Sequence, residues 1–236
     1  MSQEWQTRQQ MLVGEEKMEK LAKSRVAVVG LGGVGGAAVE ALARGGVGGL
    51  LLIDHDTVSD SNRNRQLIAT LDTVGRAKAD AWRERVLSIN PLAQVEISRH
   101  FVKEGEDGGL FDFGPDFVID AIDTVSAKLW LMAACNERDI PFLSCMGTGN
   151  RLSCEGFAIG PIQDTAGSGC PLARVLRREV KKRSIGPVTV LYNRLAPLPA
   201  QTEAAFGRHA PGSISYVPPV AGFMAAGYGI QVLMGE

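Results

Sequence analysis

Three glycines near the N-terminus, Gly30, Gly32 and Gly35, fit the pattern G-x-G-x-x-G, which is typical of loops that bind nucleotide phosphates. The first glycine allows a tight turn, the second lets the backbone approach a phosphate, and the third packs a helix on a strand. The following helix offers free N–H groups and the positive end of its dipole to the same phosphate. Together with Gly33, these residues predict a nucleotide-binding loop, but dinucleotide and ATP sites share the pattern.

Acids and cations that follow the loop narrow the choice. Asp54 ends the next apolar stretch, nineteen residues after Gly35, where a carboxylate can accept hydrogen bonds from a ribose, and Asp56 follows it closely. Arg65 and Lys78 come next. Hydride transfer has little need of cations beside a diphosphate, whereas a reaction that expels pyrophosphate must neutralise the charge that builds on it. The set therefore favours ATP, and an NAD-dependent oxidoreductase is the weaker alternative.

Alternating strands and helices must position these residues. We predict a glycine-rich turn region at 105–114, strands at 26–29, 50–53, 94–98, 117–122, 142–145, 155–159 and 188–192, and helices at 37–43, 74–89, 126–138, 170–183 and 217–234. Such alternation predicts an α/β fold, a Rossmann-like, doubly wound and mainly parallel sheet that binds its ligand at the carboxyl ends of the strands. Gly30, Asp54 and Asp123 all lie at such ends, so we expect them to converge.

The length of 236 residues and the hydrophobic content of 45% suit one sizeable core. We expect one domain over 1–236, with an N-terminal helical arm (1–24), a nucleotide-binding core (25–146) and a C-terminal elaboration (147–236). A net charge of −1 gives no global attraction to nucleic acid or membrane, so a polyanion site must be local. The uncharged segment 217–234 contains prolines and glycines that suit a buried helix better than a membrane span.

The cysteines indicate a reducing compartment. Cys135, Cys145, Cys154 and Cys170 form no C-x-x-C pair, which argues against a zinc site and for reduced thiols. The first residues have no signal-peptide layout of basic and apolar segments. We therefore expect a cytoplasmic protein without zinc and without a membrane partner.

Five motifs give the chain a resemblance to a known family. The motifs are Gly30-Leu31-Gly32-Gly33-Val34-Gly35, Asp54-His55-Asp56, Asn62-Arg63-Asn64-Arg65-Gln66, Val74-Gly75-Arg76-Ala77-Lys78 and Asp120-Ala121-Ile122-Asp123. Their order and spacing resemble those of the ThiF/MoeB/HesA family of ubiquitin-activating-enzyme-like adenylating proteins. The resemblance implies that the glycine loop holds the phosphates of ATP and that Asp54 holds the ribose. It further implies that Asn62, Arg65 and Lys78 neutralise and orient the phosphates.

Asp123 and Arg8 each have two interpretations. By itself, an acid at a strand end often caps the next helix, here through the backbone of 124–126. Beside Arg65, Lys78 and ATP its carboxylate is the natural ligand for Mg²⁺, and the resemblance favours the metal; Asp56 has the same ambiguity with less support. Arg8 alone reads as a solvated arginine. The family places an arginine in the same R-Q-x-x-L-x-G pattern, where it reaches the ATP of a dimer partner. The resemblance therefore implies a homodimer. The apolar C-terminal helix also suggests a dimer.

Further segments, 147–150, 170–179 and 213–222, look like the tRNA threonylcarbamoyladenosine dehydratase branch of this family. Its members use ATP to activate a threonylcarbamoyl carboxylate on a tRNA adenosine, which then cyclises with net loss of water. The main alternative is activation of the C-terminus of a sulfur-carrier protein, with Cys170 as acyl acceptor and a sulfur-relay partner. Such activators usually carry C-x-x-C zinc pairs, and Cys170 before Pro171 is more simply a packing residue. A nucleotide-dependent binding module is a third alternative.

The predicted helix 170–183 is strongly basic. It carries an apolar stripe and, against one acid, the cations Arg174, Arg177, Arg178, Lys181, Lys182 and Arg183. A solvated face is the usual meaning of a charge run, but in a slightly acidic chain this helix is a candidate contact for tRNA phosphates. We expect 197–212 to be a mobile loop, and His100 and His209 to be surface residues rather than catalysts.

Overall fold

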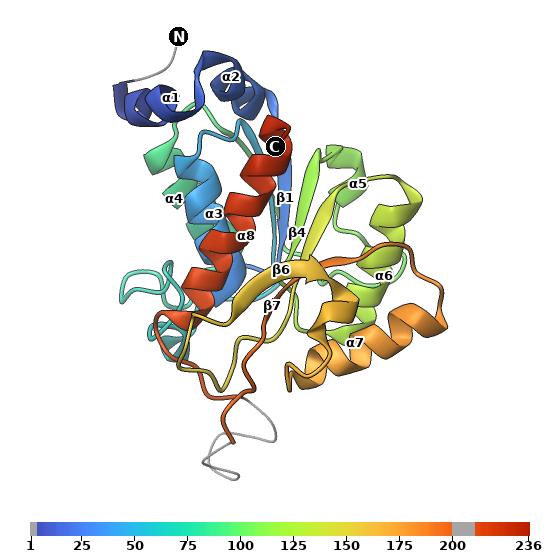
Figure 1. The fold of residues 1–236 in the computed structure, drawn as a ribbon. Helices are drawn as coiled ribbons and strands as arrows, with labels where there is room; N and C mark the ends of the chain where they lie inside the picture. The colour runs from blue at the N-terminus through green and yellow to red at the C-terminus, as the bar shows by residue number, and fades with distance from the viewer. Residues whose placement is uncertain (1–3, 200–210) are drawn as a thin grey trace.

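Seven strands form one sheet in the computed structural model, which describes residues 4–199 and 211–236 (Figure 1). They are β1 (Arg25–Val29), β2 (Gly49–Ile53), β3 (Gln94–Ser98), β4 (Phe117–Asp120), β5 (Phe142–Cys145), β6 (Phe157–Pro161) and β7 (Thr189–Asn193). Their order across the sheet is β3-β2-β1-β4-β5-β7-β6, and neighbours are parallel except β6 and β7. The predicted α/β class with a mainly parallel sheet is confirmed.

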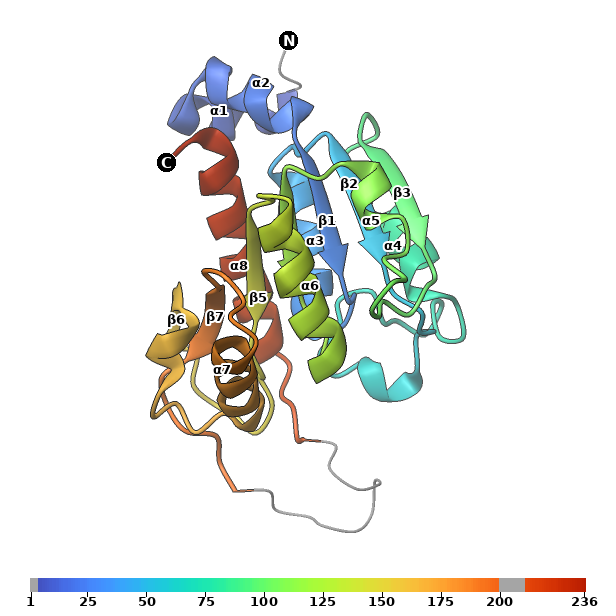
Figure 2. The same ribbon diagram turned by 90° about the vertical axis from the view of Figure 1, so that its right-hand side faces the viewer.

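Helices cover both faces of this sheet (Figure 2). They are α1 (Thr7–Val13), α2 (Glu15–Lys23), α3 (Gly33–Arg44), α4 (Lys78–Ile89), α5 (Leu110–Phe113), α6 (Val125–Glu137), α7 (Pro171–Lys182) and α8 (Val217–Met234), with short 3-10 turns η1 (Glu4–Gln6), η2 (Asp60–Asn62) and η3 (Ile162–Thr165). Alternate residues of β1 point to opposite faces. Val26 and Val28 pack with α3, α4 and α8, whereas Ala27 and Val29 pack with α5, α6 and α7. Strands buried on both sides are apolar throughout, which is why β1 is a continuous hydrophobic run.

α8 packs closely along α3. A Cβ added at Gly222 would lie 2.1 Å from the carbonyl oxygen of Val34 and 2.7 Å from Ala37 Cβ, so only glycine permits this approach. Ala225 and Ala226 on the same helix are fully buried. By length and composition alone α8 could cross a membrane, but half of it is buried inside the protein. This packing agrees with the predicted buried helix.

The N-terminal arm lies at the end of the sheet where β1 begins (Figure 1). Met18 and Leu21 of α2 are buried there, and Leu21 belongs to the core that contains α3 and α8. The parallel strands run away from this arm, so their carboxyl ends, where a ligand is expected, lie at the opposite end of the sheet.

Two predicted boundaries near the site are wrong. The helix predicted from position 74 begins at Lys78, because Gly75 has a φ of 87°, which no α-helix accommodates. The strand predicted to reach 122 ends at Asp120. There the N–H of Ile122 donates to the Asp120 side chain rather than to a neighbouring strand.

Other segments also differ from the prediction. The sixth strand covers 157–161 instead of 155–159. The turn region 105–114 contains the one-turn helix α5, whose Leu110 and Phe113 are buried in the core. Most of the predicted loop 197–212, with His209, lies outside the described residues.

Candidate nucleotide site

A cavity of about 700 Å³ opens at the carboxyl ends of the central strands. It lies where the strand order reverses between β1 and β4, which is the usual ligand position in a doubly wound sheet. Nine of the predicted site residues line it, namely Gly30, Gly32, Gly33, Asp54, Asp56, Asn62, Arg65, Lys78 and Asp123. The predicted convergence of these residues is therefore observed, whereas Gly35 and Arg8 do not line this cavity.

The glycines of the nucleotide-binding loop have different structural roles. Gly30 has a φ of 88°, and a Cβ there would lie 2.8 Å from the carbonyl oxygen of Ala121. A Cβ on Gly35 would lie only 1.8 Å from the carbonyl oxygen of Gly30, so this glycine packs helix on strand. A Cβ on Gly32 would have Gln66 Nε2, at 3.8 Å, as its nearest neighbour among the described residues. α3 begins at Gly33 rather than at 37, and no side chain caps it, so the loop itself supplies the N–H groups of the helix end.

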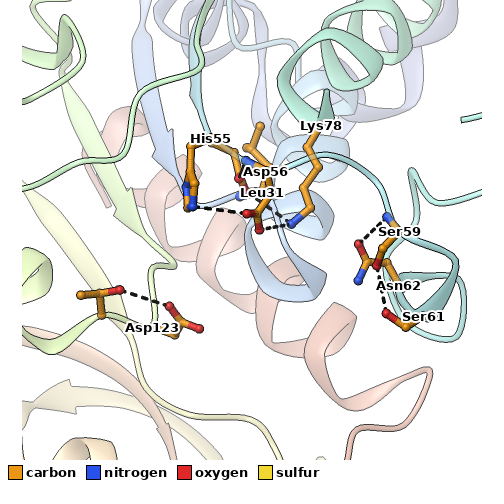
Figure 3. A network of polar contacts seen from close by, with 10 residues as sticks. Leu31, His55, Asp56, Ser59, Ser61, Asn62, Lys78 and Asp123 are labelled. Atoms are coloured by element: carbon orange, nitrogen blue, oxygen red, sulfur yellow. Dashed lines mark hydrogen bonds and ion pairs between the residues drawn. The ribbon is translucent and has the colours of Figure 1, made fainter. Parts of the chain in front are cut away.

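Lys78 is held between two carboxylates at the end of β2 (Figure 3). It is buried, and its Nζ donates to Asp56 Oδ2 at 2.8 Å and lies 3.9 Å from Asp54 Oδ2. Burial raises the pKa of Asp56, but the hydrogen bond and charge of Lys78, with a smaller contribution from His55, hold that pKa below its ordinary value. The lysine therefore has a fixed position at the cavity wall.

Asp54 is oriented by backbone donors. Its Oδ2 accepts the N–H of Leu31 at 2.7 Å and its Oδ1 accepts the N–H of Asp56 at 2.8 Å. Because each carboxylate oxygen accepts more than one hydrogen bond, both retain capacity for ribose hydroxyls. Asp54 also ties the glycine loop to the end of β2.

Asn62 and Arg65 lie on the loop that follows β2. Asn62 is buried, and its Oδ1 accepts the N–H of Ser59 in a capping box, so it also has a structural role that the sequence did not indicate. Arg65 Nη1 donates to the carbonyl oxygen of Ser61 at 3.0 Å and to Asn64 Oδ1 at 2.8 Å. Among the described residues no carboxylate forms an ion pair with Arg65, so its charge is available to a bound anion.

Asp123 stands apart from the Lys78–Asp56 pair (Figure 3). Its side chain is exposed at the cavity, and among the described residues its Oδ1 accepts only a long hydrogen bond, 3.5 Å, from the Thr124 hydroxyl. α6 has Thr124 as its N-cap without a side-chain cap, so the capping interpretation of Asp123 is not observed. A hard carboxylate oxygen that faces the cavity fits Mg²⁺ coordination.

A second acidic group fits a metal less well. The ligand atoms of Asp54, His55 and Asp56 lie within 4.8 Å of one another. Lys78 already places its ammonium group 2.8 Å from Asp56, and this positive charge opposes a cation at the same place.

Several cavity residues were not predicted as site residues. Gln66 is buried, and its Oε1 has no partner among the described residues. His55 and Phe101 meet edge to face at 4.9 Å on another part of the wall. His100, expected at the surface, is exposed at the rim of the cavity. Gln66 and His55 lie inside motifs that were recognised, whereas His100 and Phe101 come from a loop that only the fold brings to the cavity.

Arg8 lies on α1 and is exposed, in the arm at the opposite end of the sheet (Figure 1). It therefore does not contribute to the cavity of its own chain. This position is compatible with the prediction that Arg8 acts in a partner subunit, which remains a prediction.

The basic helix α7 begins at the nucleotide cavity. Leu172 in its first turn lines that cavity. Further along, a second cavity of about 680 Å³ is lined by four of the predicted cations, Arg174, Arg177, Arg178 and Lys181. The predicted apolar stripe consists of Leu172, Val175, Leu176 and Val180. Leu176 and Val180 are buried, together with Ala173, whereas Leu172 and Val175 are only partly buried.

Cys170, the residue before α7, is buried and does not line the nucleotide cavity. Its Sγ lies close to Gly147, where an added Cβ would be 3.4 Å from the sulfur. Burial lowers the pKa of the neighbouring Arg151, and its interactions with the Cys170 side chain partly offset this effect. The burial of Cys170 and its contact with Gly147 support the packing interpretation.

Comparison with known proteins identifies similar chains. The ThiF family pattern matches residues 6–236. A tRNA threonylcarbamoyladenosine dehydratase of Bacillus subtilis is 38% identical over 98% of this chain and 94% of its own length. The crystal structure of an Escherichia coli tRNA N6-threonylcarbamoyladenosine dehydratase in complex with ATP superposes with a TM-score of 0.88, at 32% identity over 99% of this chain and 96% of that one. An Escherichia coli molybdopterin-synthase adenylyltransferase is 39% identical, but over only 53% of this chain and 50% of its own length.

Proposed function

This chain belongs to the ThiF family, and from that premise we propose that it is an ATP-dependent tRNA threonylcarbamoyladenosine dehydratase. The observation that carries the proposal is one cavity in which a glycine loop, the cations Arg65 and Lys78 and the carboxylate of Asp123 converge. The match to the Bacillus subtilis dehydratase, over 94% of that protein, supports the tRNA substrate.

The first step is the activation of a carboxylate. The threonylcarbamoyl carboxylate attacks the α-phosphate of ATP, which forms an acyl-adenylate and breaks the bond to pyrophosphate. Lys78 and Arg65 stabilise the charge that builds on the departing pyrophosphate. Mg²⁺ bound at Asp123 would add positive charge at the phosphates.

The second step closes a ring within the substrate. A nucleophile of the same threonylcarbamoyl group attacks the activated carbonyl, gives up its proton, and displaces AMP. Because both groups belong to one molecule, proximity supplies much of the acceleration, and no enzyme cysteine is required. This agrees with the burial of Cys170 behind the cavity lining.

Mass spectrometry of nucleosides tests this function directly. tRNA that carries the threonylcarbamoyl group is incubated with the protein, ATP and Mg²⁺, and digested to nucleosides. We expect a product lighter by one water, formed only when ATP is present. An unchanged nucleoside in the presence of ATP would refute the proposal.

Activation of a sulfur-carrier C-terminus is the second candidate function, because a molybdopterin-synthase adenylyltransferase matches about half of the chain. Carrier-stimulated exchange of pyrophosphate into ATP, without a change in the tRNA nucleoside, would favour it. Cys170→Ser separates the two routes. Retained tRNA product supports the cysteine-free mechanism, whereas lost acyl transfer would make Cys170 an acceptor and imply a sulfur-relay partner.

We also propose that the active form is a cytoplasmic homodimer in which Arg8 reaches the partner's ATP. Phe223 on the outer side of α8 is half exposed, which leaves apolar surface for a second copy. Mixing two inactive variants, Arg8→Ala and Lys78→Ala, tests this arrangement. A mixed dimer would hold one site with both residues intact, so activity should reappear. No recovery, with subunit exchange demonstrated, would show that Arg8 does not act in the partner's site.

We propose that tRNA phosphates bind along α7. Its N-terminal turn reaches the nucleotide cavity, and Arg174, Arg178 and Lys181 follow on the same helix. Arg178→Ala and Lys181→Ala should weaken tRNA binding and lower the salt dependence of log K by about one counterion per lost contact. An unchanged salt dependence would show that this helix face is merely solvated.

A further inference from the structure

A completely buried ion pair lies next to the nucleotide cavity. Lys128 of α6 donates from its Nζ to Asp120 Oδ2 at 2.8 Å, to the carbonyl oxygen of Asp120 at 3.3 Å and to Ser144 Oγ at 3.0 Å. The Ser144 hydroxyl donates to the same Asp120 Oδ2 at 2.6 Å, and the N–H of Ile122 donates to Asp120 Oδ1 at 3.2 Å. The three side chains have no exposed surface, and each of their polar atoms has a partner.

This network joins the elements that carry the cavity wall. Asp120 is the last residue of β4, and residues 121–123 directly after it line the cavity. Ser144 is paired with Asp120 across β4 and β5, and residues 145–149 line the cavity from the other strand. Lys128 stands in the first turns of α6, the helix that follows Asp123. One ammonium group therefore links both strand ends to the helix after the loop.

Stability does not explain why a charge pair is buried here. Desolvation of two charges offsets most of their attraction, and well-packed apolar residues in such a place are often equally stabilising. A fully satisfied polar network instead restricts its neighbourhood to one arrangement. In this protein the restricted neighbourhood is the β4–α6 loop, whose Ile122 amide is bound by Asp120.

We propose that Lys128 is a positioning residue that fixes the β4–α6 loop so that the Asp123 carboxylate faces the nucleotide. Through this placement Lys128 sets the Mg²⁺ dependence of ATP binding. The inference rests on the proposed function only in its use of ATP and Mg²⁺, and it holds whether the acyl substrate is tRNA or a carrier protein.

Calorimetric titration of the full chain tests the proposal without turnover. ATP affinity is measured first without Mg²⁺ and then over a range of Mg²⁺ concentrations. In Lys128→Met the Mg²⁺-free affinity should be unchanged, because the glycine loop and Asp54 are untouched. The Mg²⁺ concentration for half-maximal enhancement should rise about 10- to 100-fold, the usual effect of removing a group that orients a metal ligand. Amide exchange should become faster at Ile122 than in the sheet.

Two further variants control for stability. If Lys128→Met does not fold, the double variant Lys128→Met/Asp120→Asn, which buries no charge, carries the same measurement and the same expectation. Arg85→Met removes a different ion pair, with the buried Glu40 on α3, away from the cavity residues. It should lower the stability and leave the Mg²⁺ response as in the wild type.

The outcomes distinguish the possibilities. A folded Lys128 variant with wild-type Mg²⁺ dependence would overturn the proposal and leave the dehydratase assignment intact. A wild-type protein that binds ATP regardless of Mg²⁺ would refute the role of Asp123 and this inference with it. Neither result bears on the tRNA substrate, which the nucleoside measurement decides separately.

Discussion

Replacing Gly32 by alanine should separate phosphate binding from folding. Gly32 has a φ of −74°, which alanine adopts, and within the described part of the chain an added Cβ would meet nothing closer than Gln66 Nε2 at 3.8 Å. The same change at Gly35 would place a Cβ 1.8 Å from the carbonyl oxygen of Gly30, and neither backbone can move without breaking the turn. We therefore expect Gly32→Ala to fold and Gly35→Ala to fail.

The size of the effect follows from the local geometry. At a compatible backbone position, glycine to alanine changes stability by less than about 1 kcal/mol, often favourably, because the unfolded chain loses freedom. The methyl group of Gly32→Ala instead takes up space at the cavity wall, where a phosphate must approach the backbone. If it breaks one hydrogen bond to a charged phosphate, worth about 1.5–3 kcal/mol, ATP affinity should fall about 10- to 150-fold.

Urea unfolding and calorimetric titration with ATP measure the two effects separately. Gly114→Ala is the matched control, because Gly114 caps α5 with a φ of 63° and a Cβ there would have open space. Its left-handed alanine should cost about 1–2 kcal/mol in stability and leave ATP affinity unchanged. If Gly32→Ala binds ATP as tightly as the wild type, this loop does not hold the phosphates.

Three further predictions concern charge and burial. Lys78→Met should fold and should lower the rate of adenylation on the order of 10²-fold or more. The rate is measured as pyrophosphate exchange, and an unchanged rate would show that Lys78 does not stabilise the phosphates. Burial raises the pKa of Glu40, but the guanidinium groups of two arginines outweigh it and hold that pKa below 4.5. The Glu40 contribution to stability is therefore complete above pH 4.5 and lost as the pH falls through the lowered pKa. Urea unfolding at a series of pH values should show that Glu40→Gln lacks this part of the pH dependence. A pH profile identical to that of the wild type would contradict the role of Glu40. Burial raises the pKa of Cys145 to about 12, so this thiol should not react with iodoacetamide in the folded protein. Iodoacetamide should label the half-buried Cys154 first. Early labelling of Cys145 would contradict its buried position.

The sequence predicted the parts of the site that depend on local pattern. The glycine loop is set by spacing within six residues, and Asp54 and Asp123 follow apolar runs that read directly as buried strands. Parallel strands then require these ends to meet. Gln66 and Phe101 could not be assigned in this way, because their place in the cavity depends on how the loops after β2 and β3 fold back.

Helix and strand limits failed where a long-range or backbone effect overrode the pattern. The periodic stretch from position 74 favours a helix, but the left-handed Gly75 delays it to Lys78. The apolar run after Phe117 favours a longer strand. However, Asp120 hydrogen-bonds to Lys128 and to the N–H of Ile122, so Ile122 does not continue the strand pairing. Neither effect leaves a periodic signal in the sequence.

The position of the cavity follows from how the chain leaves β1 and β4. After β1 the chain turns at Gly30 into α3 on one face of the sheet, and after β4 it turns at Asp120 into α6 on the other face. The two turns are in direct contact, since a Cβ on Gly30 would lie 2.8 Å from the carbonyl oxygen of Ala121. On the β1 side the shape of the turn is fixed by glycines, whose spacing can be recognised in the sequence. On the β4 side we propose that it is fixed by Lys128, which stands within an apolar helix and belongs to no recognised motif, so this support of Asp123 became visible only in the structure.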